Sequence, residues 1–153
     1  MNNFNVASSS DQSPDFYRNF ASLFSVYFPF VSDDHIKALD ESGYGLYRCV
    51  MHIDRIMDDK EVNRLPFMLS LFENTVLTLR DLFQPSSDFW RLWNERKYFL
   101  FQSIDNEKKL NYSYTQWSDY CDIAIKKAEM GAVAIDAMHC ISNEQDWEIH
   151  NAI

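Results

Sequence analysis

The chain is poor in the residues that interrupt regular structure, with only three glycines and four prolines among 153 residues. Such a composition argues against a fold with many tight turns and favours helices. Basic residues are also few: 14 against 23 acidic residues leave a formal charge of −9, which opposes binding to nucleic acid or to an anionic membrane. No apolar run approaches the roughly 20 residues that span a bilayer. We therefore expect a soluble protein with no nucleic-acid partner and no transmembrane segment.

Cysteine is scarce as well. Cys49, Cys121 and Cys140 are odd in number, show no Cys-x-x-Cys pair and fall within apolar helical patterns. These features indicate reduced core residues rather than a disulfide framework or a metal site, and hence a cytoplasmic protein. The polar stretch of residues 1–13 lacks the charged and apolar regions of a secretory signal, so we expect it to be a flexible N-terminus.

Aromatic residues, by contrast, make up 16% of the chain, and apolar residues recur with the period of a helix. The length is suited to one domain, here residues 14–153. The start, stop and cap signals predict these helices: one from Ser13-Pro14 to Pro29; one capped by Ser32 or Asp33 that pauses or bends at Gly43 and Gly45 and ends at Asp59; one from Phe67 to Phe83; one capped by Ser86 or Ser87 and ending near Lys109; and one capped by Thr115 that runs through Met138, before a short segment capped by Asn143.

The short connections between these helices predict antiparallel neighbours. The expected fold is therefore all-α, an antiparallel bundle of about five to six helices. The helix from Phe67 to Phe83 is apolar enough to predict burial on more than one side.

The feature that carries most chemistry is a pair of aspartates, Asp54 and Asp58, within an apolar helical pattern. Residues four apart lie on one side of a helix, so their carboxylates can converge on a single hard cation such as Mg²⁺. Acidic pairs at helix ends are usually solvated, and Asp59 with its charged neighbours fits that simpler interpretation. Met51 and Ile56, however, place the pair within or beside an apolar stripe.

The order of these features resembles the class I isoprenoid synthases, specifically the squalene and phytoene synthase branch. In that family an aromatic-Arg stretch leads into Asp-x-x-x-Asp, and here Tyr47-Arg48 leads into Asp54 and Asp58. A later Tyr-Cys stretch followed by small residues is similar to Tyr120-Cys121 and the step from Ala128 to Gly131, with alanine in place of the first glycine. The resemblance implies an isoprenoid-synthase-like bundle, or half of one.

The resemblance also implies Mg²⁺-dependent ionisation of a prenyl diphosphate, as in a terpene or isoprenoid synthase. Asp54 and Asp58 would be the catalytic metal ligands, with Asp59 as an auxiliary ligand. Arg48 and Arg55 would lie near the diphosphate or pair with the aspartates. Tyr47, Tyr120 and Gly131 would complete the substrate site.

The chain lacks the second acidic motif of that family, and the resemblance covers residues 43–141, about the N-terminal half of a synthase. Half a bundle would expose its pocket wall, so we expect a homo-oligomer or a partner chain that supplies the second half. An alternative is a noncatalytic helical subunit that completes or regulates a partner synthase. A nucleotide pyrophosphohydrolase would need paired glutamates, and Glu61, Glu73 and Glu95 are too scattered.

Overall fold

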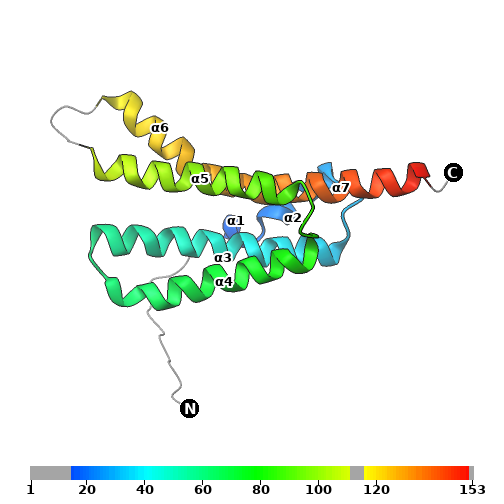
Figure 1. Ribbon diagram of the computed structural model, residues 1–153, viewed down its shortest axis with the longest axis horizontal. Coiled ribbons are helices and arrows are strands. Elements are labelled where there is room, and N and C mark those ends of the chain that lie inside the picture. Colours follow the sequence, from blue (N-terminus) through cyan, green and yellow to red (C-terminus); the bar gives the residue numbers. More distant parts are fainter. Residues whose placement is uncertain (1–14, 111–115, 152–153) are drawn as a thin grey trace, which may run out of the picture.

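The structure, a computed structural model, describes residues 15–110 and 116–151, with side chains for residues 16–110 and 116–143. The expected flexible stretch, residues 1–13, and the expected cap Thr115 lie outside the described residues. The described residues form helices and no strand, which confirms the all-α prediction. Figure 1 shows two antiparallel layers, one of α3 and α4 and one of α5, α6 and α7, with the short helices α1 and α2 beside them.

The first layer is a hairpin of α3 (Asp33–Asp58) and α4 (Leu65–Leu82). Ser32 is the N-cap of α3, and its Oγ accepts a hydrogen bond from the His35 N–H (3.3 Å). We expected a pause or a bend at Gly43 and Gly45, but the helix is not interrupted there.

The prediction that the helix of Phe67 to Phe83 is buried on more than one side is wrong. Only Thr75 and Leu79 of α4 are buried, whereas four of its apolar side chains, Leu65, Phe67, Leu69 and Leu77, are 40–54% exposed. The physical reason is the layering: α4 packs mainly against α3, and its other sides face away from the second layer.

The second layer contains α5 (Phe89–Lys108), α6 (Trp117–Ala128) and α7 (Val133–Asn151). The single long helix expected from Thr115 through Met138 is instead interrupted by a 3₁₀ segment, η3 (Glu129–Ala132). Arg96 of α5 connects this segment to the following helix, because it binds Glu129 of η3 and makes a two-pronged ion pair with Asp136 of α7 (2.8 and 3.2 Å). The predicted cap at Asn143 is also wrong, since α7 continues through that residue: the buried face of α7 outweighs a local capping preference.

The expected first helix is also divided, into α1 (Asp15–Arg18) and α2 (Phe20–Phe24), followed by the 3₁₀ segment η1 (Ser25–Tyr27). The cause is a carboxylate from another helix. Asp40 of α3 accepts hydrogen bonds from the Ala21 N–H (2.7 Å) and the Ser22 N–H (3.2 Å), and so caps the start of α2. Asn19, the N-cap of α2, is a residue type that favours this position, but its side chain makes no cap hydrogen bond, and Asp40 caps the helix instead.

The most tightly packed part of the core lies near the connection from α4 to α5. Phe83 and Phe89 stack there with ring centroids 4.0 Å apart, and both are at most 2% exposed. Leu39 and Leu79 of the first layer and Met138 of the second are equally buried. Each such side chain contributes roughly 1.5–3 kcal/mol through burial, so this end fastens the two layers together.

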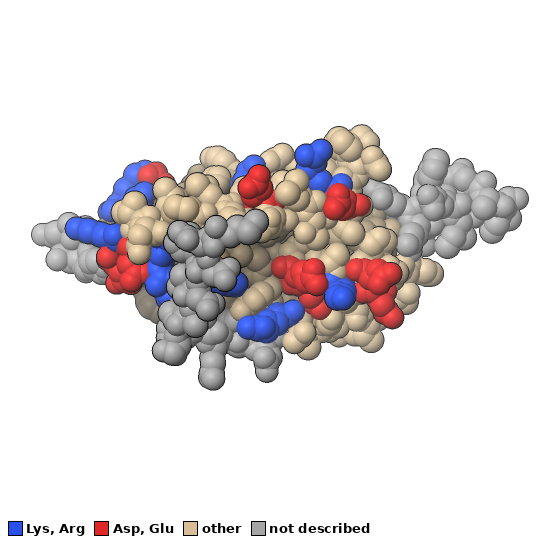
Figure 2. Space-filling view, turned by 90° about the horizontal axis from the view of Figure 1, so that it is seen from below, with Lys and Arg blue, Asp and Glu red and all other residues tan. Residues whose placement is uncertain are grey.

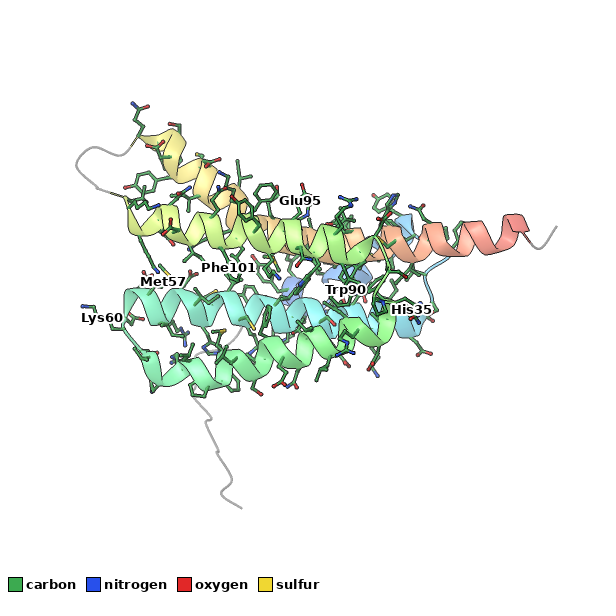
Figure 3. The ribbon with its side chains drawn as sticks, in the orientation of Figure 1. His35, Met57, Lys60, Trp90, Glu95 and Phe101 are labelled. Carbon is green, nitrogen blue, oxygen red and sulfur yellow. The ribbon has the colours of Figure 1, made fainter. Side chains whose placement is uncertain are left out.

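Away from that end the two layers are less closely joined. In Figure 3, Trp90 lies near the α4–α5 connection, whereas Phe101 projects from α5 into the space between α5 and α3. Trp90 packs against the core and donates a hydrogen bond from Nε1 to the Gln84 carbonyl (3.0 Å), while Phe101 remains 53% exposed.

The surface is mixed in charge. On the face seen in Figure 2, acidic and basic side chains are interspersed with wide areas of uncharged residues. None of the helices in residues 15–110 and 116–151 has both the length and the apolar composition needed to cross a bilayer.

Candidate functional site

An apolar cavity of about 570 Å³ lies between the two layers, beside α1 and α2. Its walls come from α1, α2, α3, the end of α6, η3 and the start of α7, with one side chain from α4. The lining residues are Phe16, Tyr17, Phe20, Leu39, Ser42, Gly43, Leu46, Tyr47, Val50, Asp54, Leu79, Lys127, Ala128, Met130, Gly131, Ala132, Val133, Ala134 and Ile135. A volume of this size falls within the range of small-molecule sites in proteins.

Small residues on α3, on η3 and on the adjoining ends of α6 and α7 leave this space open. A Cβ atom built on Gly43 of α3, or on Gly131 of η3, would meet no heavy atom within 4 Å. Alanines add to the same wall at positions 128, 132 and 134. Gly131 therefore borders open space on the side where its side chain would lie.

Aromatic rings form the wall on the side of α1. Tyr17 stacks on Tyr47 of α3, with centroids 4.0 Å apart and planes 11° from parallel, and Phe16 meets Phe20 edge to face at 5.4 Å. These rings present π faces and hydrocarbon edges, which suit an unsaturated apolar ligand.

Two charged side chains, Asp54 and Lys127, are among the described residues that line the cavity. Lys127 of α6 donates hydrogen bonds to Asp54 Oδ1 of α3 (2.9 Å) and to Glu107 Oε2 of α5 (2.7 Å), so it joins three helices. Burial lowers the pKa of Lys127, but the hydrogen bonds to Glu107 and Asp54 raise it more, and the net pKa lies above its ordinary value. The ammonium therefore stays protonated, and the trio carries a net charge of −1.

The structure brings together three of the residues predicted from the sequence. Tyr47, Asp54 and Gly131 all line the cavity, although they come from α3 and η3. Their convergence was not evident from spacing, because Gly131 lies far along the chain from the two α3 residues.

The other predicted residues lie elsewhere. Asp58 and Asp59 are exposed at the end of α3, where the Asp59 N–H donates to the Arg55 carbonyl (3.0 Å). Arg48 is half-buried, with its guanidinium 5.2 Å from the centroid of the Phe67 ring. Tyr120 is half-buried beside Trp117, at 6.5 Å between centroids. None of the five residues Arg48, Arg55, Asp58, Asp59 and Tyr120 lines the cavity.

The predicted aspartates are not arranged to bind Mg²⁺ in this structure. Asp54 is already bonded to an ammonium, and Asp58 points from the exposed end of the helix. Among the described side chains, no group of three or more His, Cys, Asp or Glu residues is placed to hold a metal ion. The assignment of Mg²⁺ to Asp54, Asp58 and Asp59 therefore stays a prediction.

Sequence reasoning missed Lys127 and Glu107. Both sit among charged residues at helix ends, which usually indicates solvated positions. Asp54 and Lys127 are 73 residues apart, so no spacing rule connects them. The available signal was the place of Lys127 in the sequence: it lies within the apolar pattern of the expected fifth helix and close to the small residues Ala128 and Gly131.

Comparisons with protein-family models, with curated proteins and with solved structures gave no match to this chain. The resemblance to isoprenoid synthases thus rests on the short motifs around Asp54 and Tyr120 alone.

Proposed function

We propose that this chain binds an isoprenoid-type ligand, a prenyl diphosphate, whose hydrocarbon chain occupies the apolar cavity. The observation that carries the proposal is the cavity itself: about 570 Å³ of space with largely apolar walls and stacked tyrosines on one side. Burial of each methylene group there would contribute about 0.8 kcal/mol to binding. The motif resemblance supplies the ligand class.

The chain's own residues would act on such a ligand in two ways. The alkyl and aromatic walls would exclude water from the chain, and Tyr17 and Tyr47 would offer π faces to its double bonds. Lys127 already occupies one carboxylate oxygen of Asp54, so we propose binding of the ligand and not its chemical conversion. Ionisation of the diphosphate with Mg²⁺ at Asp54 and Asp58 remains the finer expectation of the resemblance.

A cavity-filling variant tests the proposal. Gly43→Leu should place its side chain in the open space beside Gly43 and abolish the binding of farnesyl diphosphate and of farnesol, measured by isothermal titration calorimetry and by thermal shift. Ala124→Leu, which adds a comparable side chain at an exposed position of α6, is the matched control and should bind as the parent protein does. At 100 times Kd a ligand should stabilise the fold by about 2.7 kcal/mol.

Two results would contradict the proposal: no binding of either compound by the parent chain, or unchanged binding by Gly43→Leu. A separate arm tests the metal prediction. If Mg²⁺ strengthens the binding of farnesyl diphosphate, and if Asp54→Asn and Asp58→Asn both remove that gain, the aspartates act as metal ligands. If both variants respond to Mg²⁺ as the parent chain does, they do not.

The second candidate is the noncatalytic helical subunit, in which α4 contacts a partner chain or a second copy. The observation that favours it is the exposure of apolar side chains on α4, among them Leu65 (40%) and Leu69 (54%), one turn apart. Light scattering at micromolar concentration should then show an assembly that Leu65→Glu with Leu69→Glu dissociates. A monomeric parent chain would exclude self-association.

A further inference from the structure

A line of tyrosines leads from the cavity to the surface of α3. Tyr17 and Tyr47 line the cavity and stack on each other, and Tyr44 lies next to Tyr47 with centroids 6.4 Å apart and planes 20° from parallel. Tyr17 is 39% exposed, so this wall meets solvent. Tyr44 is not part of the lining and stands one ring farther out.

Two guanidinium groups gather on that outer ring. Arg18 of α1 lies 4.6 Å from the Tyr44 centroid, and Arg48 of α3 lies 5.9 Å from the same centroid. Arg48 also contacts the ring of Phe67 (5.2 Å) on α4. Both guanidinium groups therefore lie beside the same ring, and an anion bound there would meet positive charge from α1 and from α3.

The charged side chains that line the cavity itself have the opposite character. There Asp54 and Glu107 flank Lys127, and the three charges sum to −1. An anionic head group would be repelled from that border and attracted to the arginines. An amphipathic ligand in the cavity therefore has a preferred direction.

We infer that Arg18 and Arg48 form an anion site at the tyrosine-lined edge of the cavity, where they hold the phosphate head group of the ligand without a metal ion. This inference rests on the proposed function, because it assumes that the hydrocarbon chain lies in the cavity. The planar guanidinium donates paired hydrogen bonds that match phosphate oxygens, and its stacking on Tyr44 holds it in place.

The test compares farnesyl diphosphate, farnesol and inorganic pyrophosphate by calorimetry on the full chain in EDTA. We expect farnesyl diphosphate to bind roughly tenfold or more tightly than farnesol, because charge-assisted hydrogen bonds add to burial of the chain. The double variant Arg18→Gln with Arg48→Gln should lose that advantage and leave the affinity for farnesol unchanged. Arg91→Gln, an exposed arginine of α5 that pairs with Asp88 and Glu95, is the matched control.

The outcomes separate this inference from the proposed function. Two results refute the anion site but leave the proposed binding in the cavity intact. In the first, farnesol binds and the diphosphate group adds no affinity in EDTA. In the second, the diphosphate group adds the same affinity in the double variant as in the parent chain. If inorganic pyrophosphate binds as tightly as farnesyl diphosphate, the arginines hold a free anion independently of the cavity, and the inference also fails. If neither prenyl compound binds, the proposed function itself is wrong.

Discussion

Replacement of Gly45 by alanine should destabilise the protein, although alanine is the better helix former. Gly45 lies on the side of α3 that faces α4, and a Cβ atom there would overlap Thr75 Oγ1. Thr75 is 4% exposed, and its hydroxyl donates a hydrogen bond to the Leu71 carbonyl (2.9 Å), so its side chain has little room to move. Gly43, two residues earlier, provides the contrast, because a Cβ atom there meets nothing within 4 Å.

The magnitudes follow from two opposing effects. A glycine in a helix interior costs about 1 kcal/mol relative to alanine, so each substitution gains about that much. Overpacking at a tight contact costs about 1–3 kcal/mol, and this cost applies to Gly45→Ala alone. We therefore expect Gly43→Ala to raise the free energy of unfolding by about 1 kcal/mol, and Gly45→Ala to lie about 1–3 kcal/mol below Gly43→Ala.

Urea denaturation followed by circular dichroism at 222 nm measures both values. A third variant, Gly45→Ala with Thr75→Ala, should recover most of the loss, since it removes the atom that the new methyl group meets. The double-mutant cycle would then give a favourable coupling between the two positions. Equal stability of Gly43→Ala and Gly45→Ala would refute the reasoning, because the close approach of α3 to α4 at Gly45 would then have no energetic consequence.

Two further predictions concern titratable groups. Burial raises the pKa of the Cys49 thiol to about 11, and the residue is only 3% exposed. Iodoacetamide at pH 8 should therefore alkylate the half-buried Cys121 well before Cys49, which peptide mass spectrometry would record. Equal rates of alkylation would contradict the burial of Cys49. Lys127→Met should destabilise the fold by roughly 1 kcal/mol at neutral pH, because it leaves Asp54 and Glu107 without their shared cation. The pKa of Lys127 is raised in the folded state, so the contribution of Lys127 to stability is complete at any pH below its ordinary pKa of 10.5. That contribution is lost as the pH rises through the folded-state pKa. The difference in unfolding free energy between the parent chain and Lys127→Met should therefore shrink in that range. A difference that stays constant to the highest measurable pH would contradict this assignment.

The predictions that succeeded concern properties that neighbouring residues decide. Helices form where apolar residues recur every three to four positions, and Ser32 caps α3 through a hydroxyl that reaches only three residues along the chain. The bounds of α4 and α5 agree with expectation to within a few residues for the same reason. The predictions that failed concern the break before α2, the 3₁₀ segment η3 and the cap at Asn143. At the first two, a side chain from another helix makes a contact that spacing along the chain does not reveal: Asp40 caps α2 from α3, and Arg96 binds η3 from α5.

The candidate site divides in the same way. Asp54, Tyr47 and Gly131 could be named from motifs, because spacing on one helix and small residues are visible in the sequence. The partners that give these residues their setting could not, since Lys127 and Arg18 reach α3 from separate helices.

By itself, the sequence determined a helical protein with a net negative charge, and it marked one helix as chemically unusual. Composition and periodicity are sums over local preferences, so they are readable without the fold. Only the tertiary structure decided that Asp54 meets a lysine, that the small residues border a cavity and that two arginines share one tyrosine ring. These are contacts between residues far apart in the chain, and they exist only because the packing of the two layers brings them together.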